Sequence, residues 1–316
     1  MDTHLTTSPT EAAQFVRRGL LAAFPTETVY GLGADALNPD AVEAIFAAKG
    51  RPADNPLIVH LVDREQLSQV AGSVPAVADQ LLAHFAPGPL TLILPRAASL
   101  PSVVTAGLNT VGVRFPRHET ARAFLRACET PVAAPSANRS GRPSPTDWTA
   151  VEEDLGGRIA CILKGRRTDA GVESTVLDCT VDPPALLRPG ALPLERLETV
   201  VGTIALGDER GDAEQPRSPG TKHRHYAPAA RVRLVDHPSD AEPGATRAYI
   251  GRERPEAPSA FGECLVVPDA ETYARELFHF FRTCDRAGCT VIYAQELPRE
   301  GLGRALNDRL RRAAAR

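Results

Sequence analysis

Short apolar runs alternate with segments of helical periodicity over residues 8–202. The apolar runs predict buried strands at 20–24, 57–61, 90–94, 111–115, 131–134, 159–163, 174–178 and 185–187. Apolar residues at helical spacing predict helices at 9–18, 39–49, 76–85, 119–128, 147–155 and 194–200. Interleaved strands and helices are typical of an α/β sheet. Because their order is not a regular strand–helix–strand repeat, we expect strands of mixed direction.

Two of these helices carry local start and stop signals. Ser8-Pro9-Thr10-Glu11 is a capping box with proline at the first helical position, and Asn38-Pro39 is a second cap followed by proline. Gly19 ends the first helix and Gly50 the second, because glycine accepts the left-handed conformation that commonly follows a helix. These boundaries can be predicted without any tertiary contact.

A change in composition divides the chain. Residues 207–220 are rich in Gly, Pro, Asp and Glu and lack apolar periodicity, which is typical of an interdomain linker, and basic residues follow up to 225. Strand patterns resume at 232–235, 247–250, 264–267 and 290–293, with helices at 271–285 and 299–315. We therefore expect a first domain at 8–202, a linker at 203–228 and a small second α/β domain at 229–316.

Charge and composition exclude several classes of protein. The 316 residues include 36 Lys and Arg against 39 Asp and Glu, so the chain is not a general nucleic-acid-coating protein. The longest apolar stretches are too short to span a bilayer, and residues 1–10 contain no signal-peptide core, so we expect a cytoplasmic location. The six cysteines show neither a C-x-x-C pair nor zinc spacing, which indicates buried, reduced thiols.

The sequence lacks the standard nucleotide-binding fingerprints. Gly31-Leu32-Gly33 is without the third glycine of the dinucleotide turn, and Gly220-Thr221-Lys222 is without the preceding P-loop frame. Neither a Gly-x-Ser-x-Gly elbow nor a His-Glu-x-x-His helix occurs. A phosphate site would therefore be built from dispersed cations, hydroxyls and backbone amides.

Polar segments interrupt the ends of the predicted strands. Threonines and a carboxylate at 25–33 follow a strand, where open α/β sheets place ligands, and a polar turn is an equal alternative. Prolines aim Lys49 and Arg51 in fixed directions, as polyphosphate binding requires, although the same residues also make an ordinary helix C-cap. His60 ends an apolar strand, where a satisfied core histidine is the commoner role.

Two further segments add cations and hydroxyls. Arg114 alternates with apolar residues on a strand, so it must pair with an anion, either a structural Asp or Glu or a ligand. Segment 133–145 holds serines, an asparagine and two arginines among prolines, which suits close approach to a ribose or phosphate and argues against a flexible solvent loop. Segments 171–175 and 187–190 repeat the combination of a hydroxyl or Arg beside glycine.

These segments closely resemble, in order, the threonylcarbamoyl-AMP synthase family, whose core is the YrdC-like domain. The matching segments are 25–33, 49–51, 54–57, 87–91, 134–138, 171–175 and 187–190, and the resemblance covers roughly residues 8–202. The motif at 218–228 is similar to that of the two-domain members. The resemblance implies an α/β (α+β) fold, with a twisted, mostly mixed open sheet and helices around a basic cavity. A smaller C-terminal Rossmann-like α/β domain would follow.

The resemblance also implies an activity, L-threonylcarbamoyladenylate synthesis. Members of the family join L-threonine, bicarbonate or CO₂, and ATP into threonylcarbamoyl-AMP and pyrophosphate, the first step of threonylcarbamoyladenosine formation in tRNA. By correspondence of motifs, threonine would contact Thr28, His60, Arg114, Ala134 and Ser174. ATP would contact Arg51, Asn55, Thr110, Ser136, Ser144, Arg188 and Tyr226. Lys49, near the phosphates, and Arg51 are the expected catalytic residues.

Cofactor and partners follow from the same resemblance. Mg²⁺ is expected to accompany ATP, without a resident protein metal site. The product would pass to the tRNA threonylcarbamoyl transferase machinery, with no membrane involved and at most a weak contact with tRNA. Thr221, His223 and Arg224 depart from the residues common in the family. We expect residues 218–228 to fold over the cavity as a lid, with Tyr226 closing on the nucleotide; a plain tether, or a metal role for His223 and His225, is the alternative.

Two other functions fit parts of the pattern. One is RNA binding without catalysis, which a basic concave surface would allow and which the global charge disfavours. The other is a carbamoyl-transfer protein of hydrogenase maturation, which shares this domain but also carries zinc-binding cysteines and further domains that the sequence does not show. No Ser-His-Asp set or carboxylate dyad stands out, so positioning and charge neutralisation would supply the rate.

Overall fold

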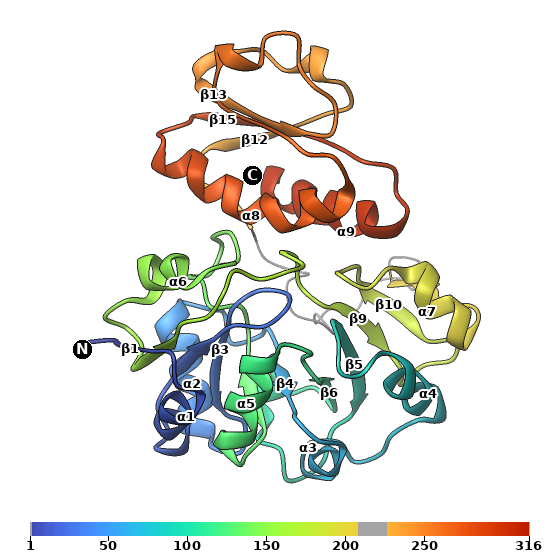
Figure 1. Ribbon diagram of the computed structural model, residues 1–316. Helices are drawn as coiled ribbons and strands as arrows, with labels where there is room; N and C mark the ends of the chain where they lie inside the picture. The colour runs from blue at the N-terminus through green and yellow to red at the C-terminus, as the bar shows by residue number, and fades with distance from the viewer. Residues whose placement is uncertain (1, 208–225, 316) are drawn as a thin grey trace.

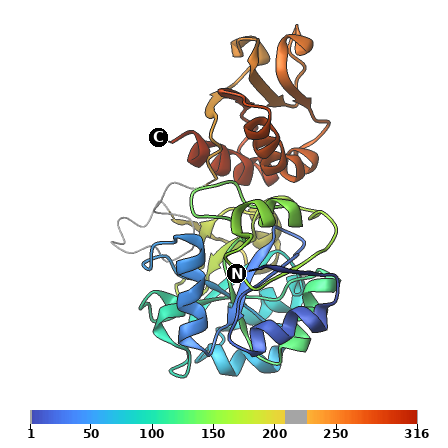
Figure 2. The ribbon, with the colours of Figure 1, turned by 90° about the vertical axis from the view of Figure 1, so that its left-hand side faces the viewer.

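The computed structural model describes residues 2–207 and 226–315, which form two lobes stacked on one another (Figures 1 and 2). The first lobe contains, in chain order, β1 (His4–Thr6), α1 (Pro9–Arg17), β2 (Ala22–Phe24), β3 (Gly31–Asp35), α2 (Pro39–Lys49), β4 (Ile58–His60), η1 (Arg64–Gln66), α3 (Leu67–Val70), α4 (Ala76–Phe85), β5 (Leu90–Pro95), η2 (Ser102–Thr105), β6 (Thr110–Arg114), α5 (Glu119–Cys128), β7 (Val132–Ala134), α6 (Trp148–Leu155), β8 (Cys161–Leu163), β9 (Thr175–Asp178), β10 (Ala185–Arg188), α7 (Leu194–Val201) and β11 (Ala205–Leu206).

The strands of this lobe form one 11-stranded sheet in the order β1-β8-β2-β3-β7-β4-β6-β5-β9-β10-β11. The pairs β2/β3, β3/β7, β4/β7, β5/β6 and β9/β10 are antiparallel, and the other neighbours are parallel. The prediction of mixed strand directions is therefore confirmed. The pairing of β4 with β6 places His60 directly beside Arg114.

The predicted helix boundaries agree closely with the structure. Ser8 caps α1 by accepting a hydrogen bond from the amide of Glu11, and Asn38 caps α2 through the amide of Ala41. Gly50 ends α2 in the left-handed conformation, at φ 61°. The capping box of α1 is only half formed, because the Glu11 carboxylate accepts from Thr6 instead of from the backbone of Ser8.

Strands β1, β3 and β11 were not predicted. Strand β3 was missed because its sequence Gly-Leu-Gly lacks the β-branched run of an ordinary strand. It forms between β2 and β7, and Gly33 is needed for that close approach. A Cβ on Gly33 would lie 2.9 Å from Cγ1 of Val132 and 3.1 Å from the ring of Phe24. The glycines thus serve sheet packing, which no local pattern reveals.

The second lobe contains β12 (Arg231–Val235), η4 (Pro238–Asp240), β13 (Gly244–Gly251), η5 (Pro258–Ala260), β14 (Phe261–Val266), α8 (Ala270–Arg286), β15 (Val291–Gln295) and α9 (Gly301–Ala314). Its four strands are all parallel, in the order β12-β15-β13-β14. Helices α8 and α9 lie between this sheet and the first lobe (Figure 1). They cover their own sheet and also supply the side chains that meet the first lobe.

Buried and half-buried ion pairs join the two lobes. Arg282 of α8, which is 4% exposed, pairs with Asp154 of α6 at 2.8 Å, and Arg167 pairs with Glu276 of α8, also at 2.8 Å. The backbone of α8 also packs against Gly171, at φ 72°, where an added Cβ would collide with the backbone of Ala274. The first lobe therefore needs glycine at this point for two separate reasons, backbone conformation and space.

Three features matter within the described residues: the cysteines, clusters of metal-binding side chains and long apolar helices. All six cysteines are free; Cys264 is half-buried and the others are buried. Within 2–207 and 226–315, no group of three or more His, Cys, Asp or Glu could hold a metal ion, and no helix is long and apolar enough to cross a membrane. The linker and lid expected at 203–228, and the His223 and His225 alternative, lie largely or wholly at 208–225, outside the described residues.

Gly171→Ala should loosen the docking of the two lobes. The matched control is Gly107→Ala, which also has a positive φ, 81°, but has nothing within 4 Å of an added Cβ. Left-handed strain costs about 1–2 kcal/mol at either site, and only Gly171→Ala also displaces α8. We expect a larger loss of thermal stability and a larger radius of gyration by small-angle scattering for Gly171→Ala. Equal behaviour of the two variants would contradict this account of the interface.

Candidate active site

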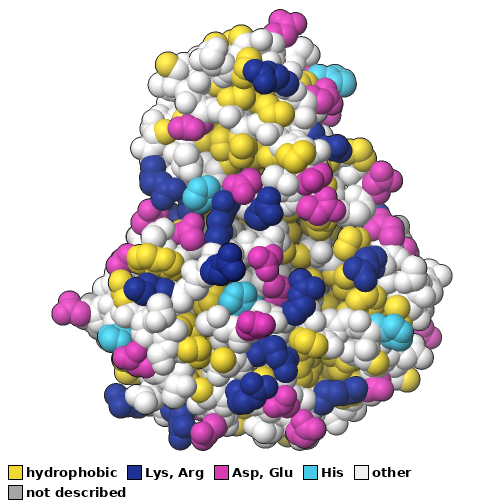
Figure 3. Space-filling view, viewed as in Figure 1, with side chains coloured by type: hydrophobic (Ala, Val, Ile, Leu, Met, Phe, Trp, Pro, Cys, Tyr) yellow, Lys and Arg dark blue, Asp and Glu magenta, His cyan; other side chains and the backbone are white. Residues whose placement is uncertain are grey.

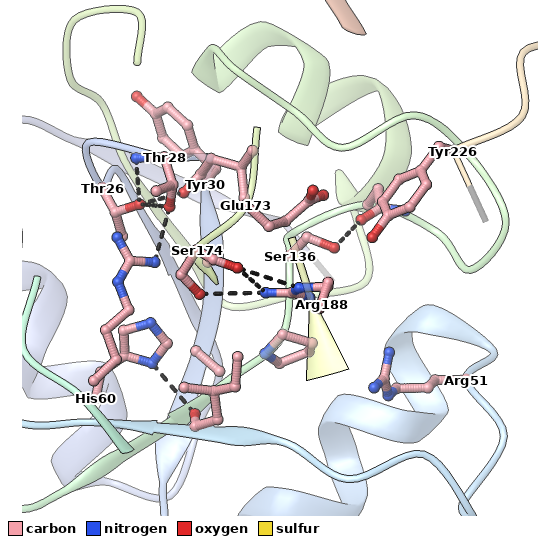
Figure 4. Close-up of a pocket in the computed structure, with 17 residues that line it drawn as sticks. Thr26, Thr28, Tyr30, Arg51, His60, Ser136, Glu173, Ser174, Arg188 and Tyr226 are labelled. Carbon is pink, nitrogen blue, oxygen red and sulfur yellow. Dashed lines mark hydrogen bonds between the residues drawn. The ribbon is translucent and has the colours of Figure 1, made fainter. Parts of the chain in front are cut away.

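A cavity opens where several strand ends and loops of the first lobe meet, and it encloses about 630 Å³ including its mouth (Figure 4). Most of the residues predicted from the sequence line it, although they come from segments far apart in the chain. These are Thr28, Arg51, His60, Arg114, Ala134, Ser136, Ser174, Arg188 and Tyr226. Lys49, Asn55, Thr110 and Ser144 are not among the lining residues.

One side of the cavity is a chain of hydroxyls ending on an arginine. The Thr26 hydroxyl donates to the carbonyl of Val29 at 2.7 Å, so the 2.8 Å bond between the Thr26 and Thr28 hydroxyls is donated by Thr28. Thr28 Oγ1 in turn accepts from Nη1 of Arg114 at 2.8 Å. Since each hydroxyl has one proton to donate, the donor and the acceptor are fixed in every hydrogen bond of this series.

Arg114 is held by hydrogen bonds through two guanidinium nitrogens and by an ion pair through the third. Besides Thr28, it contacts the carbonyl of Gly88 through Nε at 3.4 Å, and Nη2 pairs with the carboxylate of Glu27 at 2.8 Å. Burial alone would raise the pKa of Glu27, but the charge and hydrogen bonds of Arg114 outweigh burial, so the pKa is lowered. The anion that the sequence required for Arg114 is therefore the structural carboxylate of Glu27.

His60 is buried beside Arg114 and is neutral. Its side chain lies edge-on to the ring of Phe24, with 5.8 Å between ring centroids, and Nδ1 is 3.2 Å from the carbonyl of Ile58. Burial, together with the positive charge of Arg114, lowers the pKa of His60 from 6.5 to about 3. Across the physiological pH range this histidine can offer a hydrogen bond but no charge.

Two more arginines line the cavity away from Thr28: Arg188 lies beside Ser174, and Arg51 lies on the far side (Figure 4). Arg188 is 5% exposed and binds the carbonyl of Ser174 through Nε and Nη2, at 3.2 and 2.9 Å. Arg51 binds the carbonyls of Asn55 and Pro56, at 3.2 and 3.0 Å. Burial lowers the pKa of Arg51 to about 10, and the like charge of Arg188 adds to that shift. Two mutually repelling cations in one pocket favour a multiply charged anion between them.

The loop after β7 is fixed from beneath by Lys49. The Lys49 ammonium donates to the carbonyl of Ser136 at 2.5 Å and to that of Asn138, and it is 3% exposed. The Asn138 side chain donates to the carbonyls of Arg139 and Arg142, both at 2.8 Å. Burial lowers the pKa of Lys49 well below its ordinary value. Lys49 thus lies behind the loop, whereas Ser136 lies on the cavity wall.

The other predicted residues outside the cavity lie in its support. Ser144 is buried and donates to Oε1 of Glu173 at 2.6 Å. Asn55 is 1% exposed and lies beside Arg51, and its backbone carbonyl accepts a hydrogen bond from Nε of Arg51. Thr110 lines a separate small cavity with Pro56.

Two family models together match nearly the whole chain. One, described as telomere recombination, matches residues 14–190, and the other, described as the threonylcarbamoyl-AMP synthase C-terminal domain, matches residues 192–315. A threonylcarbamoyl-AMP synthase from Pyrococcus abyssi is 47% identical over 96% of this chain and 93% of its own length. One from Bacillus subtilis is 44% identical over 96% and 92%. This chain belongs to the threonylcarbamoyl-AMP synthase family.

A solved structure agrees over both lobes. The crystal structure of P. abyssi Sua5 complexed with L-threonine has a TM-score of 0.91 and 43% identity, covering 99% of this chain and 98% of that one. The expected fold is therefore confirmed, as is the expected activity: the chain is an ATP-using nucleotidyltransferase that makes threonylcarbamoyl-AMP. This family membership excludes both alternatives, RNA binding without catalysis and carbamoyl transfer in hydrogenase maturation.

The site residues predicted from the sequence did not include two carboxylates that support the cavity, although the carboxylate of Glu27 was counted among possible ligand contacts at 25–33. Glu27 pairs with Arg114, and Glu173, which lines the cavity, pairs with Arg309 of α9 at 2.7 Å. A usable signal was present, since each comes immediately before a predicted threonine contact, Thr28 or Ser174. A charged residue next to a predicted substrate contact, in a segment whose neighbours are buried, needs a partner of opposite charge.

Acid should weaken the fold through His60. The unfolded chain binds a proton near pH 6.5 and the folded chain only near pH 3, so stability falls as the pH drops through that window. Between about pH 7 and pH 5 this contributes about 2 kcal/mol, and His60→Gln should remove it. Urea unfolding at both pH values measures the difference, with His84→Gln at an exposed position as control. An unchanged pH dependence in His60→Gln would contradict the assignment.

Proposed function

We propose that this cavity is the catalytic site, in which L-threonine, bicarbonate or CO₂, and ATP meet. The observation that carries the proposal is convergence: hydroxyls and cations from segments far apart in sequence line one cavity. Hydroxyls, neutral His60 and the Glu27-paired Arg114 lie on one side, and Arg188 and Arg51 lie away from them (Figure 4). The domain that holds it is residues 8–202, followed by a linker at 203–228 and a C-terminal domain at 229–316.

In this proposal, threonine binds on the side of Thr28, His60, Arg114, Ala134 and Ser174. Support comes from the relative whose crystal structure is described as complexed with L-threonine. Arg114 acts as a fixed positive charge for the carboxylate of threonine. Its nitrogens already have protein partners, so the substrate carboxylate would share these nitrogens with them. The substrate hydroxyl pairs with neutral polar groups such as His60, so valine would leave them unpaired and be rejected.

ATP binds on the side of Arg51, Ser136, Arg188 and Tyr226 in this proposal. Asn55 and Ser144 support this side of the cavity. The carbonyl of Asn55 accepts a hydrogen bond from Arg51, and the hydroxyl of Ser144 donates one to the cavity carboxylate Glu173. The proposed contact of Thr110 would extend this side toward Pro56. Lys49 contributes to catalysis by fixing the loop that carries Ser136.

The residues fit Mg²⁺ that arrives on the phosphates of ATP rather than in a protein cage. No three-ligand acidic, histidine or cysteine group exists in the parts of the chain that the structure describes, and Mg²⁺ commonly keeps its waters and substrate phosphates as ligands. When bound, the ion would neutralise phosphate charge. Arg51 and Arg188 would neutralise the remainder as the carbamate of threonine attacks the α-phosphorus and pyrophosphate leaves.

The protein's contribution to the chemistry is positioning and shielding. The neutral amine of threonine attacks CO₂ and releases a proton to solvent, or attacks bicarbonate with loss of water. The resulting carbamate displaces pyrophosphate from the α-phosphorus of ATP, so neither bond needs a protein nucleophile. The carbamate and the mixed anhydride both decompose in water, and a site built from buried groups slows that loss. We propose that the product passes in the cytoplasm to the tRNA threonylcarbamoyl transferase machinery. Acidic and basic side chains alternate on the face seen in Figure 3, which suits at most a weak tRNA contact.

Arg114→Lys tests the threonine side. A lysine ammonium cannot serve Thr28, Glu27 and Gly88 together, so the hydroxyl chain loses its fixed end. We expect the KM for threonine to rise about tenfold or more, the loss of about one charge-assisted hydrogen bond, while the KM for ATP changes little. Arg117→Lys, at an exposed position three residues on, is the control. A wild-type KM for threonine in Arg114→Lys would refute this role.

Pyrophosphate release tests the proposed reaction as a whole. Measured with threonine, serine or valine, each with and without bicarbonate, release should require both bicarbonate and a hydroxy-amino acid. Valine should fall below threonine by a factor of roughly 10⁴, since buried polar partners would be left unpaired. Release that ignores the amino acid and bicarbonate would overturn the proposal.

A further inference from the structure

Arg309 of α9 reaches across the interface to the wall of the cavity. Its side chain is fully buried, although it belongs to the C-terminal lobe, and Nε donates to Oε2 of Glu173 at 2.7 Å. Nη1 is bound by the adjacent Asp308. A buried arginine costs several kcal/mol in lost hydration, so its retention at this point calls for an electrostatic role.

Glu173 is the carboxylate on which Arg309 acts. Its Oε1 accepts from Ser144 at 2.6 Å and its Oε2 from Arg309, while the side chain lines the cavity (Figure 4). Burial would raise the pKa of Glu173, but Arg309 and then Arg188 outweigh it, so the pKa is lowered and the group is charged. Without Arg309, a buried negative charge would face the place proposed for a triphosphate.

Arg309 also holds Tyr226, the first described residue after position 207. Its guanidinium lies 5.2 Å from the centre of the Tyr226 ring, and Phe278 of α8 stacks on that ring with 5.3 Å between centroids. Tyr226 has a φ of 66°, which is costly for a residue other than glycine. Contacts from α8 and α9 therefore maintain a strained residue on the cavity wall.

Most groups around Glu173 belong to the proposed ATP side of the cavity, although Arg188 also donates to the carbonyl and hydroxyl of Ser174, on the proposed threonine side. Arg188, Ser144 and Tyr226, which we propose for ATP, are its neighbours in charge or hydrogen bonding. The proposed threonine side has an anion of its own, Glu27, paired with Arg114. A change at Arg309 should therefore affect the binding of ATP more than that of threonine, whereas a general loss of folding would affect both alike.

We propose that Arg309 is a positioning residue through which the docked C-terminal lobe completes the ATP side of the cavity, by neutralising and orienting Glu173 and holding Tyr226. The inference rests on the proposed role of the cavity. It assigns the C-terminal lobe a part in nucleotide binding, exerted through Glu173 and Tyr226, rather than that of an attached module.

The test compares Arg309→Met, Arg309→Lys, Glu173→Gln and the double variant Glu173→Gln/Arg309→Met. One control is Arg311→Met, on the same helix, whose side chain is 42% exposed and pairs with Glu296 at 2.7 Å. The other is Glu276→Gln, which removes a different ion pair between the lobes, to Arg167. The KM values for ATP and threonine come from pyrophosphate release by the full chain, and thermal unfolding is followed in parallel.

Arg309→Met should raise the KM for ATP by about tenfold or more, and that for threonine by less than about threefold, because the unpaired Glu173 repels phosphate. The double variant should recover most of the ATP affinity, since removing both partners removes the stranded charge. Arg309→Lys should lie between, and both controls should stay within about twofold of the wild type.

Two results would overturn the inference. One is a wild-type KM for ATP in Arg309→Met. The other is an equal rise for both substrates that the double variant does not relieve, which would show a merely structural role. If Arg309→Met fails to fold, the ATP-to-threonine ratio in Arg309→Lys and in the double variant decides the question. If pyrophosphate release by the wild type and the controls did not depend on threonine and bicarbonate, that result would contradict the proposed function instead.

Discussion

A buried carboxylate paired with a buried arginine is the interaction on which the cavity depends, and it occurs on both sides. Glu27 holds Arg114 and Arg309 holds Glu173, at 2.8 and 2.7 Å. Such pairs add little net stability, because desolvation offsets most of the attraction. Breaking one is costly, however, since a lone buried charge remains. Each pair therefore fixes a geometry more than it stabilises the fold.

The charges left over after this pairing decide what the cavity attracts. On one side, Glu27 offsets the charge of Arg114 and His60 is neutral, which leaves little net charge among the hydroxyls. On the other side, burial and the like charge of Arg188 lower the pKa of Arg51, and both arginines donate to backbone carbonyls. This asymmetry matches a zwitterionic amino acid beside a polyphosphate, the two substrates that a threonylcarbamoyl-AMP synthase must hold together.

Rigidity around the cavity comes from buried donors that meet backbone carbonyls. Lys49 fixes the loop after β7, and Arg188 fixes Ser174 through the carbonyl of that residue. Positioning is the main catalytic device available to a site without a protein nucleophile, so such bonds bear directly on rate. The C-terminal lobe extends the same device across the interface through Arg309.

Local sequence determined the helix caps at Ser8 and Asn38, most of the strands, and the set of polar segments that meet at the cavity, because caps, apolar periodicity and motifs act within a few residues. Tertiary structure alone decided three things. It made a strand of Gly31–Asp35, it turned Lys49 beneath its loop, and it brought Arg309 to Glu173, 136 residues away. Each depends on space and charge between segments distant in sequence, and a buried polar group chooses its partner only when the chain has closed around it.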